Sequence, residues 1–178
     1  MADFNWSNAP VNYELFAKDV PRNQLERDLI VLVDTREALP WTFDYPTQQE
    51  ALKAGDYSIA LKIGGRVRQF HRRFAVERKA TPDDLLTCFT HDRERFKKEL
   101  CRLQRCDIAA VICDFDLETF LDAVSKRAVE PASMWHTLLA FQAYFRIPFI
   151  LAPSEEMAKD AFITLARCYI RSRILGKA

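Results

Sequence analysis

The chain has 178 residues, of which 49% are hydrophobic and 29% are charged, a composition typical of one folded domain with its own core. Its longest apolar runs, residues 29–33 and 147–152, fall far short of the roughly 20 residues of a membrane span, and residues 1–16 do not resemble a secretory signal, so we expect an intracellular protein without a membrane partner. The formal net charge of +1 excludes a uniformly basic nucleic-acid-binding chain, so a local patch must meet any such partner.

We expect residues 1–27 to be an N-terminal extension and residues 28–178 to be the single domain. The domain begins with Leu29–Val33, a continuous apolar run that predicts a strand buried on both faces. The run ends abruptly in a polar tetrapeptide, Asp34-Thr35-Arg36-Glu37. The proline-containing segment that follows it is predicted to be a loop.

A hairpin is predicted next. Residues alternate in polarity from Asp56 to Ile63, a Gly64-Gly65 turn signal follows, and a second alternating run leads to Glu77-Arg78-Lys79. Residues of equal parity share a face within one strand, and in a hairpin with an even-numbered loop an even residue of one arm lies opposite an odd residue of the other. Asp56 is therefore predicted to lie on the same face as Glu77 and Lys79, opposite an apolar face that should be core. Two registers remain open: a tight turn pairs Asp56 with Arg73 and leaves Glu77 roughly 13 Å away, whereas a wider loop over residues 64–69 puts Asp56 beside Glu77.

Helices alternate with strands through the rest of the chain. Thr81 is a capping residue and Pro82 suits the first helical position, so a helix should begin there and end near Thr90. Apolar periodicity predicts further helices over residues 92–105, 117–124, 131–145 and 154–173, and strands over residues 108–113 and 147–151. This order predicts an α/β fold in which helices flank a mixed β-sheet.

The acidic and basic residues at the ends of the predicted strands suit metal-dependent phosphodiester hydrolysis. Asp56 and Glu77 could hold a hard cation such as Mg²⁺, which polarises a phosphate and activates a water. Lys79 would offset charge or orient that water, and Asp34 could supply a third ligand. The absence of a GxxxxGK[ST] motif excludes a phosphate-loop NTPase, and the five cysteines form no CxxC pair, which argues against a zinc site.

Three motifs follow one another in the order Asp34-Thr35-Arg36-Glu37, then Gly55-Asp56-Tyr57, then Val76-Glu77-Arg78-Lys79 with Asp83 at the ERKxxxD spacing. Together they resemble the nuclease domain of the XPF family of structure-specific endonucleases, over roughly residues 28–173. The resemblance implies a restriction-endonuclease-like fold, dependence on Mg²⁺ or Mn²⁺, and cutting of branched DNA or of single-strand/double-strand junctions. It also implies dimers formed through nuclease-domain helices. The tandem helix-hairpin-helix domain of the family is not found here, so we expect a nuclease domain that stands alone.

The resemblance also assigns roles to individual residues. It makes Asp34, Asp56 and Glu77 metal ligands and Lys79 the water-orienting base or the charge stabiliser. It makes Arg36 and Arg78 candidates for contacting phosphate or for holding the carboxylates, and it makes Glu37 and Asp83 outer acidic members of the site. The predicted catalytic set is Asp34, Asp56, Glu77, Arg78, Lys79 and Asp83. The pair Asp83-Asp84 can equally well favour the positive end of the helix that follows.

A basic cluster along the hairpin is a candidate contact for the phosphates of DNA, although an ordinary exposed hairpin has the same appearance. Its arginines are Arg66, Arg68, Arg72 and Arg73. We favour the phosphate contact, because the cluster is dense and the predicted site is close to it in the sequence.

The last two predicted helices carry more large apolar side chains than covering one modest sheet requires. These residues are Trp135, Leu138, Phe141, Phe145, Phe162 and Tyr169. An exposed apolar patch usually marks an interface, so we expect a homodimer or a heterodimer through these C-terminal helices. The function predicted is a Mg²⁺-dependent DNA endonuclease. The alternative is a scaffold or DNA-binding subunit of the same fold that pairs with another nuclease and does not cut.

Overall fold

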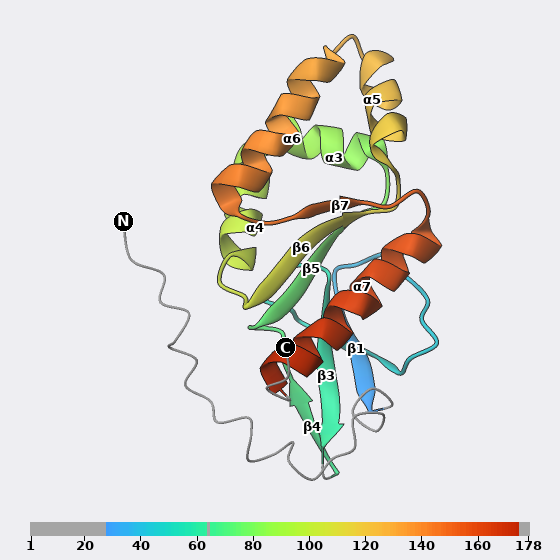
Figure 1. Cartoon of the computed structure of the whole chain (residues 1–178), viewed down its shortest axis with the longest axis vertical. Coiled ribbons are helices and arrows are strands. Elements are labelled where there is room, and N and C mark those ends of the chain that lie inside the picture. Colours follow the sequence, from blue (N-terminus) through green and yellow to red (C-terminus); the bar gives the residue numbers. More distant parts are fainter. Residues whose placement is uncertain (1–27, 64, 175–178) are drawn as a thin grey trace.

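The computed structural model describes residues 28–63 and 65–174, so the expected extension over residues 1–27 lies outside the described residues. Within these ranges the chain forms one mixed sheet of seven strands with the order β2-β1-β3-β5-β6-β7, and β4 pairs with β3 (Figure 1). The strands are β1 (Leu29–Asp34), β2 (Thr47–Glu50), β3 (Tyr57–Ile63), β4 (Arg66–Gln69), β5 (Phe74–Lys79), β6 (Ile108–Cys113) and β7 (Phe149–Leu151). The predicted α/β fold with a mixed sheet is confirmed.

The described residues also confirm the five predicted helices, with ends that differ by a few residues. They are α3 (Pro82–Phe89), α4 (Arg93–Leu103), α5 (Leu117–Ser125), α6 (Pro131–Phe145) and α7 (Glu155–Tyr169), and α7 continues as a π-helix over Ile170–Ile174. The start of α3 is the predicted one, because Thr81 Oγ1 accepts a hydrogen bond from the N–H of Asp84 at 3.3 Å. Among the described helices, none is long and apolar enough to cross a bilayer.

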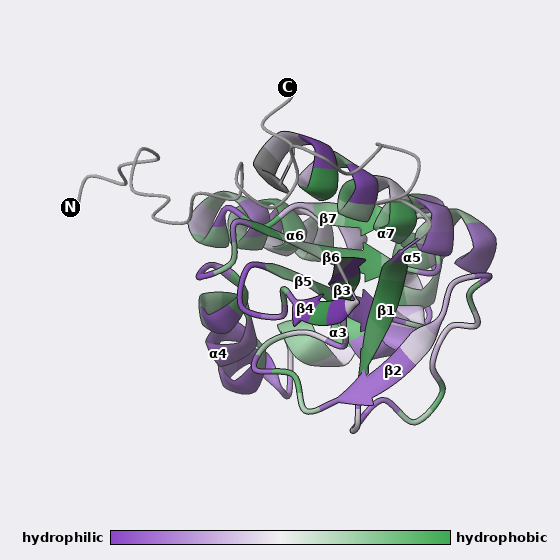
Figure 2. Cartoon of the chain, turned by 90° about the horizontal axis from the view of Figure 1, so that it is seen from below, coloured by the Kyte–Doolittle hydropathy of each residue, from purple (hydrophilic) through white to green (hydrophobic). Residues whose placement is uncertain are grey.

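The sheet lies between two helical layers, with α7 on one side and α3 and α4 on the other (Figure 2). On the first face, Phe162 and Tyr169 of α7 pack against Tyr57 and Phe74, in the core that also holds the predicted apolar face of the hairpin. On the second face, α3 to α6 cover β5, β6 and β7 with a separate aromatic core. Burial on both sides explains why β6 is as uniformly apolar as a strand of a parallel sheet should be.

Most of the large apolar residues predicted to form an interface belong to these two cores. Their exposed fractions are 3% or less: Leu138, Phe141, Phe145, Phe162 and Tyr169. The inference of an exposed patch from these side chains is therefore wrong, because α6 and α7 pack against two different faces and each needs a full apolar stripe. Larger exposed fractions occur at Leu139, 40%, and Tyr144, 78%, both on α6.

The edge strand β2 lies where the sequence predicted a loop. It runs parallel to β1, with Val31 opposite Thr47 and Asp34 opposite Glu50. Its sequence, Thr-Gln-Gln-Glu, has no apolar alternation, because most of its side chains are exposed at the edge of the sheet. Backbone hydrogen bonds to β1, and not side-chain burial, make this segment a strand, so its sequence carries little signal.

The hairpin combines the two registers that the sequence left open. Ile63 pairs with Arg66, so the turn is tight, and continuing this register would place Arg72 opposite Tyr57. Residues 70–73 instead form a turn, in which the N–H groups of Arg73 and Phe74 donate to the carbonyl of Phe70 at 2.8 and 2.9 Å. Pairing then resumes in β5 with Val76 opposite Tyr57. This insertion brings Asp56 beside the end of β5, as the wider loop would have done.

Candidate active site

The strand ends that carry Asp34, Asp56 and Glu77 lie next to one another, because β1 ends, β3 begins and β5 ends at the same end of the strands. This follows from β3 being antiparallel to both of its neighbours. Backbone hydrogen bonds tie them together: the N–H of Asp34 donates to the carbonyl of Asp56, and the N–H of Asp56 donates to the carbonyl of Val76, both at 2.8 Å. The side chain of Asp56 is held as well, since its Oδ2 accepts the N–H of Arg78 at 2.8 Å.

Gly55 allows this close approach of the strands. Its φ of +68° lies in the left-handed region that favours glycine. A Cβ atom at this position would lie 2.6 Å from the carbonyl oxygen of Val76. Any other residue would therefore push the Gly55-Asp56 segment away from β5 and move the Asp56 carboxylate.

Glu77 and Lys79 form a buried pair on the same face of β5, as predicted from their parity. Lys79 Nζ donates to Glu77 Oε1 at 2.9 Å and lies 3.8 Å from Asp84 Oδ1. Burial alone would lower the pKa of Lys79, but the charges of Glu77 and Asp84 outweigh it and raise this pKa above its usual value. Lys79 is therefore protonated at neutral pH, which makes it a hydrogen-bond donor and a charge stabiliser.

The protein stabilises the ionised forms of the two acids of the site only in part. Burial, reinforced by the charge of Glu77, raises the pKa of Asp56 to about 8. Burial also raises the pKa of Glu77, and the charge of Glu99 adds to this effect while Lys79 opposes it. Two neighbouring acids whose ionised forms are disfavoured are typical of a site that is completed by a cation.

Asp34 is bound differently from these two acids. Arg36 donates to Asp34 Oδ1 from Nε at 2.6 Å and to Oδ2 from Nη2 at 3.1 Å, and Oδ2 also accepts the N–H of Leu52 at 2.8 Å. Burial by itself would raise the pKa of Asp34, but these hydrogen bonds outweigh it and hold the pKa below its usual value. Of the two roles proposed for Arg36, the geometry favours holding a carboxylate.

The predicted ligand set is therefore not assembled as one group. Within residues 28–63 and 65–174, no three His, Cys, Asp or Glu side chains are arranged to hold a metal ion. Asp56 and Glu77 are brought together, whereas both oxygens of Asp34 are engaged by Arg36 and Leu52.

Arg78, predicted in the catalytic set, extends to the opposite side of β5 from Glu77 and Lys79. Its guanidinium is buried, donates to Asp114 Oδ2 at 2.7 and 2.9 Å, and lies over the ring of Trp41 with 5.1 Å between Cζ and the ring centroid. It also donates to the carbonyl of Leu39. Strand parity could have indicated this outcome, because adjacent residues of a strand point to opposite faces.

The two outer acids of the predicted site lie at its margin or outside it. Glu37 is half-buried, its Oε1 accepts the N–H of Leu39 at 3.0 Å, and its charge adds to the raised pKa of Asp56. Asp83 faces away from Lys79 and pairs with Arg127 at 2.7 Å. Asp84 takes the place near Lys79 that the ERKxxxD spacing suggested for Asp83.

Glu99 of α4 is a member of the site that the sequence did not single out. Its Oε1 accepts the N–H of Gly55 at 3.2 Å, and its carboxylate pairs with Arg102 one helical turn later. The available signal was its position beside the buried stripe of α4, where it follows Phe96 by three residues and precedes Leu100. A charged residue at the margin of such a stripe can reach across to the sheet.

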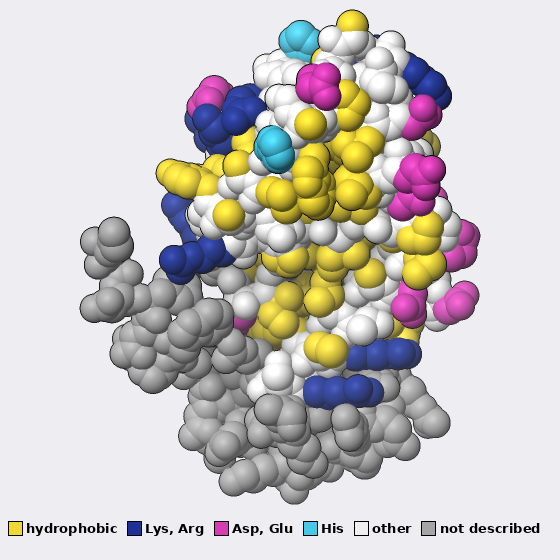
Figure 3. Space-filling view, turned by 45° about the horizontal axis from the view of Figure 1, so that its top comes forward, with side chains coloured by type: hydrophobic (Ala, Val, Ile, Leu, Met, Phe, Trp, Pro, Cys, Tyr) yellow, Lys and Arg dark blue, Asp and Glu magenta, His cyan; other side chains and the backbone are white. Residues whose placement is uncertain are grey.

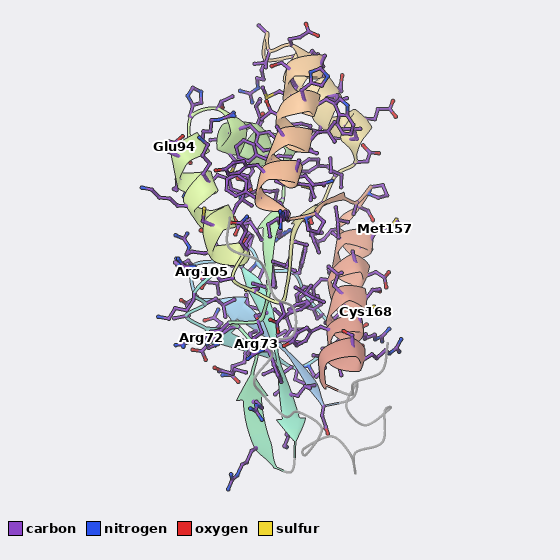
Figure 4. The ribbon with its side chains drawn as sticks, turned by 60° about the vertical axis from the view of Figure 1, so that its left-hand side comes forward. Arg72, Arg73, Glu94, Arg105, Met157 and Cys168 are labelled. Carbon is purple, nitrogen blue, oxygen red and sulfur yellow. The ribbon has the colours of Figure 1, made fainter. Side chains whose placement is uncertain are left out.

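The basic hairpin lies at the other end of the strands. β3 runs from Asp56 toward Ile63, so the tip that carries Arg66 is roughly 20 Å from the carboxylates at the usual rise per residue. Arg72 and Arg73 lie on the same side of the molecule as Arg105, which follows α4 (Figure 4). Arg73 pairs with Asp107 at 3.2 Å. The cluster is therefore close to the site in sequence but not in space.

Comparison with solved structures identifies the fold. XPF from Aeropyrum pernix matches 80% of this chain with 18% identity and a TM-score of 0.58, and XPF from Aeropyrum pernix in complex with DNA matches 82% with 18% identity and a TM-score of 0.54. The chain spans 62% and 66% of the lengths of these structures. No protein-family model and no curated protein matches it. The resemblance to XPF is thus confirmed at the level of the fold, which this chain shares over about four-fifths of its length.

Proposed function

We propose that this chain is a Mg²⁺- or Mn²⁺-dependent DNA endonuclease that hydrolyses phosphodiester bonds. One observation carries the proposal: the half-buried Asp56 and the buried Glu77 place two carboxylates at adjacent strand ends, and a protonated Lys79 lies 2.9 Å from Glu77. Two carboxylates suit a hard divalent cation, and a lysine beside them suits a phosphate. A hydrolase acting on sugars through a carboxylate pair would have no comparable use for Lys79.

The two carboxylates fit the cation because each retains an oxygen for it. Asp56 Oδ2 accepts the N–H of Arg78 and Glu77 Oε1 accepts Lys79. Across the described part of the chain, we find no hydrogen bond to Asp56 Oδ1 or to Glu77 Oε2. We therefore assign Asp56 and Glu77 as the residues that would hold the cation. Asp34 would join them only if Arg36 released its carboxylate.

The protein contributes position and charge to the reaction. A bound cation would polarise the phosphate and lower the pKa of a nearby water. Lys79 would donate a hydrogen bond to a non-bridging phosphate oxygen or to the attacking water, and its charge would offset that of the phosphate. In the hydrolysis, the water oxygen bonds to phosphorus, the bond from phosphorus to the leaving strand breaks, and the water gives up a proton. Gly55 and the backbone of Val76 would hold the Asp56 carboxylate in place throughout.

We further propose branched DNA, or a junction of single and double strands, as the substrate. The likeness to XPF structures, one of them in complex with DNA, supports DNA as the ligand. The basic side chains of the hairpin, roughly 20 Å from the site, would suit a substrate that extends beyond the cut position. We propose that a dimer or a partner subunit, bound through the C-terminal helices, supplies a further DNA-binding surface.

The second candidate function is a subunit of the same fold that binds DNA or another nuclease and does not cut. The engagement of Asp34 by Arg36 favours it, because this arrangement withdraws one of the three predicted ligands. The preserved pair of Asp56 and Glu77 favours the enzyme, because a scaffold would have no need to bury two acids beside each other at a cost in stability.

The experiment that tests the proposal compares cleavage of flap, fork and duplex DNA in Mg²⁺ and in Mn²⁺. Asp56→Asn and Glu77→Gln each remove a charge while keeping the volume, so we expect cleavage to fall by at least about a hundredfold with little change in the melting temperature or in DNA affinity. Asp160→Asn, an exposed position on α7, is the matched control.

Near wild-type cleavage by either variant at limiting Mg²⁺ would contradict the assignment of these two carboxylates. A wild-type protein that binds branched DNA and leaves every substrate intact would favour the scaffold.

A further inference from the structure

Glu99 connects α4 to the segment that carries Asp56. Its Oε1 accepts the N–H of Gly55, the residue immediately before Asp56, at 3.2 Å. Arg102 pairs with Glu99 from the next turn of α4 and holds its carboxylate in this direction. On the other side, the N–H of Asp56 donates to the carbonyl of Val76 on β5 at 2.8 Å, and a Cβ added at Gly55 would collide with that carbonyl. The Gly55-Asp56 peptide is therefore fixed from two sides, by β5 and by Glu99.

The charge of Glu99 also acts on the centre of the site. Its carboxylate interacts electrostatically with Glu77 on β5 and with Arg36, the residue that holds Asp34. The other acid of α4, Glu94, is 78% exposed and pairs with Lys97, whereas the side chain of Glu99 is only 21% exposed. Within α4, the acid that faces the sheet is thus the one that contacts the proposed site.

We infer that Glu99 is a positioning residue of the proposed cation site: it fixes the Gly55-Asp56 peptide through a hydrogen bond and adds a negative charge beside Glu77. The inference rests on the proposed nuclease function, since the cation is what both contributions would serve. Groups that orient metal ligands commonly contribute about 10- to 100-fold in metal affinity or activity. Glu99 would make such a contribution without touching the substrate.

Two substitutions separate the hydrogen bond from the charge. Glu99→Gln keeps a carbonyl oxygen that can accept the Gly55 N–H but loses the charge, whereas Glu99→Ala loses both. Glu94→Ala is the matched control, because it also removes one ion pair between residues three apart on the same helix. The full chain is used throughout, and thermal melting confirms that each variant is folded.

The hydrogen bond is tested by amide exchange of Gly55 in protein labelled with ¹⁵N-glycine, since the chain contains only four glycines. We expect exchange to accelerate by about 2- to 10-fold in Glu99→Ala and to stay close to wild type in Glu99→Gln and Glu94→Ala. This measurement requires neither metal nor DNA. Unchanged exchange in Glu99→Ala would overturn the positioning role.

The contribution to the site is tested by Mn²⁺ titration, followed by electron paramagnetic resonance, and by cleavage kinetics. We expect Glu99→Ala to bind Mn²⁺ about 10- to 100-fold more weakly and to lose kcat with an unchanged KM for DNA. Glu99→Gln should recover most of the kcat but remain weaker for Mn²⁺. Wild-type Mn²⁺ affinity in Glu99→Ala would overturn the inference. If the Glu99 variants change Gly55 exchange and Mn²⁺ affinity as expected but the wild-type protein cuts no DNA, the proposed function is overturned and the positioning role is not.

Discussion

At the scale of single residues, Asp56 makes the stability of the metal-free protein depend on pH. Its pKa is raised from 3.8 to about 8 in the folded protein, so between these values the folded state keeps a proton that the unfolded state has lost. Stability should therefore be greatest at low pH within this window and fall as the pH rises toward 8. We expect Asp56→Asn to be more stable than the wild type at pH 9 by about 1–3 kcal/mol, and similar to it near pH 4, where the unfolded wild type also keeps much of its proton.

Urea unfolding in EDTA at pH 4 and pH 9 measures this difference. Adding Mg²⁺ at pH 9 should stabilise the wild type and leave Asp56→Asn unaffected, because a ligand stabilises only the state that binds it. Equal stabilities of the two proteins at pH 9 in EDTA would show that Asp56 is ionised there without cost.

The two consecutive acids at the start of α3 offer a second test at the residue scale. Asp84 lies 3.8 Å from Lys79, whereas Asp83 pairs with Arg127 on the surface. We expect Asp84→Asn to slow cleavage about 2- to 5-fold, the order of effect of a partly exposed ion pair, and Asp83→Asn to leave the rate unchanged. Single-turnover kinetics of both variants, each the control for the other, measure the effect. If Asp83→Asn cuts DNA more slowly than the wild type, Asp83 contributes to the site, as the ERKxxxD spacing indicated.

At the scale of elements, the β3–β4 hairpin should contribute affinity for DNA at a distance from the cut. Its tip lies roughly 20 Å from the carboxylates, which corresponds to about six base pairs along a duplex. Neutralising the four arginines of the basic cluster, two on β4 and two in the turn over residues 70–73, should weaken binding and reduce the slope of log K against log salt by about 0.9 for each lost phosphate contact. The substitutions are Arg66→Gln, Arg68→Gln, Arg72→Gln and Arg73→Gln.

Fluorescence anisotropy over a range of KCl concentrations measures this slope for substrates with long and short duplex arms. Arg73 lies four residues before Glu77, roughly 13 Å at the usual rise, so arms shorter than about four base pairs should not reach the cluster, and for them the variant and the wild type should bind alike. The same slope in both proteins on long arms would show that the hairpin does not contact the DNA.

At the scale of the whole molecule, an assembly through the C-terminal helices would use the hydrophobic residues that these helices expose, Leu139 and Tyr144 on α6 and Met157 on α7. Hydrophobic side chains gather on the face of the molecule seen in Figure 3. Leu139 and Tyr144 are exposed, whereas Phe162 is fully buried. We expect light scattering at micromolar concentration to show a dimer, and Tyr144→Glu to yield monomers without a change in melting temperature. Phe162→Glu should unfold the protein, because it buries a charge in the core.

A wild-type protein that is monomeric and cuts branched DNA at its full rate would contradict the prediction that the chain acts as a dimer. A dimer that survives both Leu139→Glu and Tyr144→Glu would place the interface elsewhere.

The sequence alone predicted the elements other than β2, the core face of the hairpin and the shared face of Asp56, Glu77 and Lys79. These features depend on local periodicity, on caps such as Thr81 and on strand parity, all of which can be read within a few residues. The same parity would have placed Arg78 on the opposite face had it been applied to that residue. The edge strand β2 was not predicted, because its stability comes from backbone pairing with β1 and its side chains are mostly exposed.

Only the tertiary structure decided which of the predicted residues meet. The turn over residues 70–73 shifts the register, so that Asp56 reaches the end of β5. The docking of α3 and α4 brings Asp84 and Glu99 to the site, and Arg36 engages Asp34. Each of these outcomes depends on contacts between elements that are distant in the chain or on the choice among competing hydrogen bonds. The sequence determined which residues are candidates for the site, because its patterns are local. Packing determined which of these residues lie close together, because distances between elements are set only when the whole domain is folded.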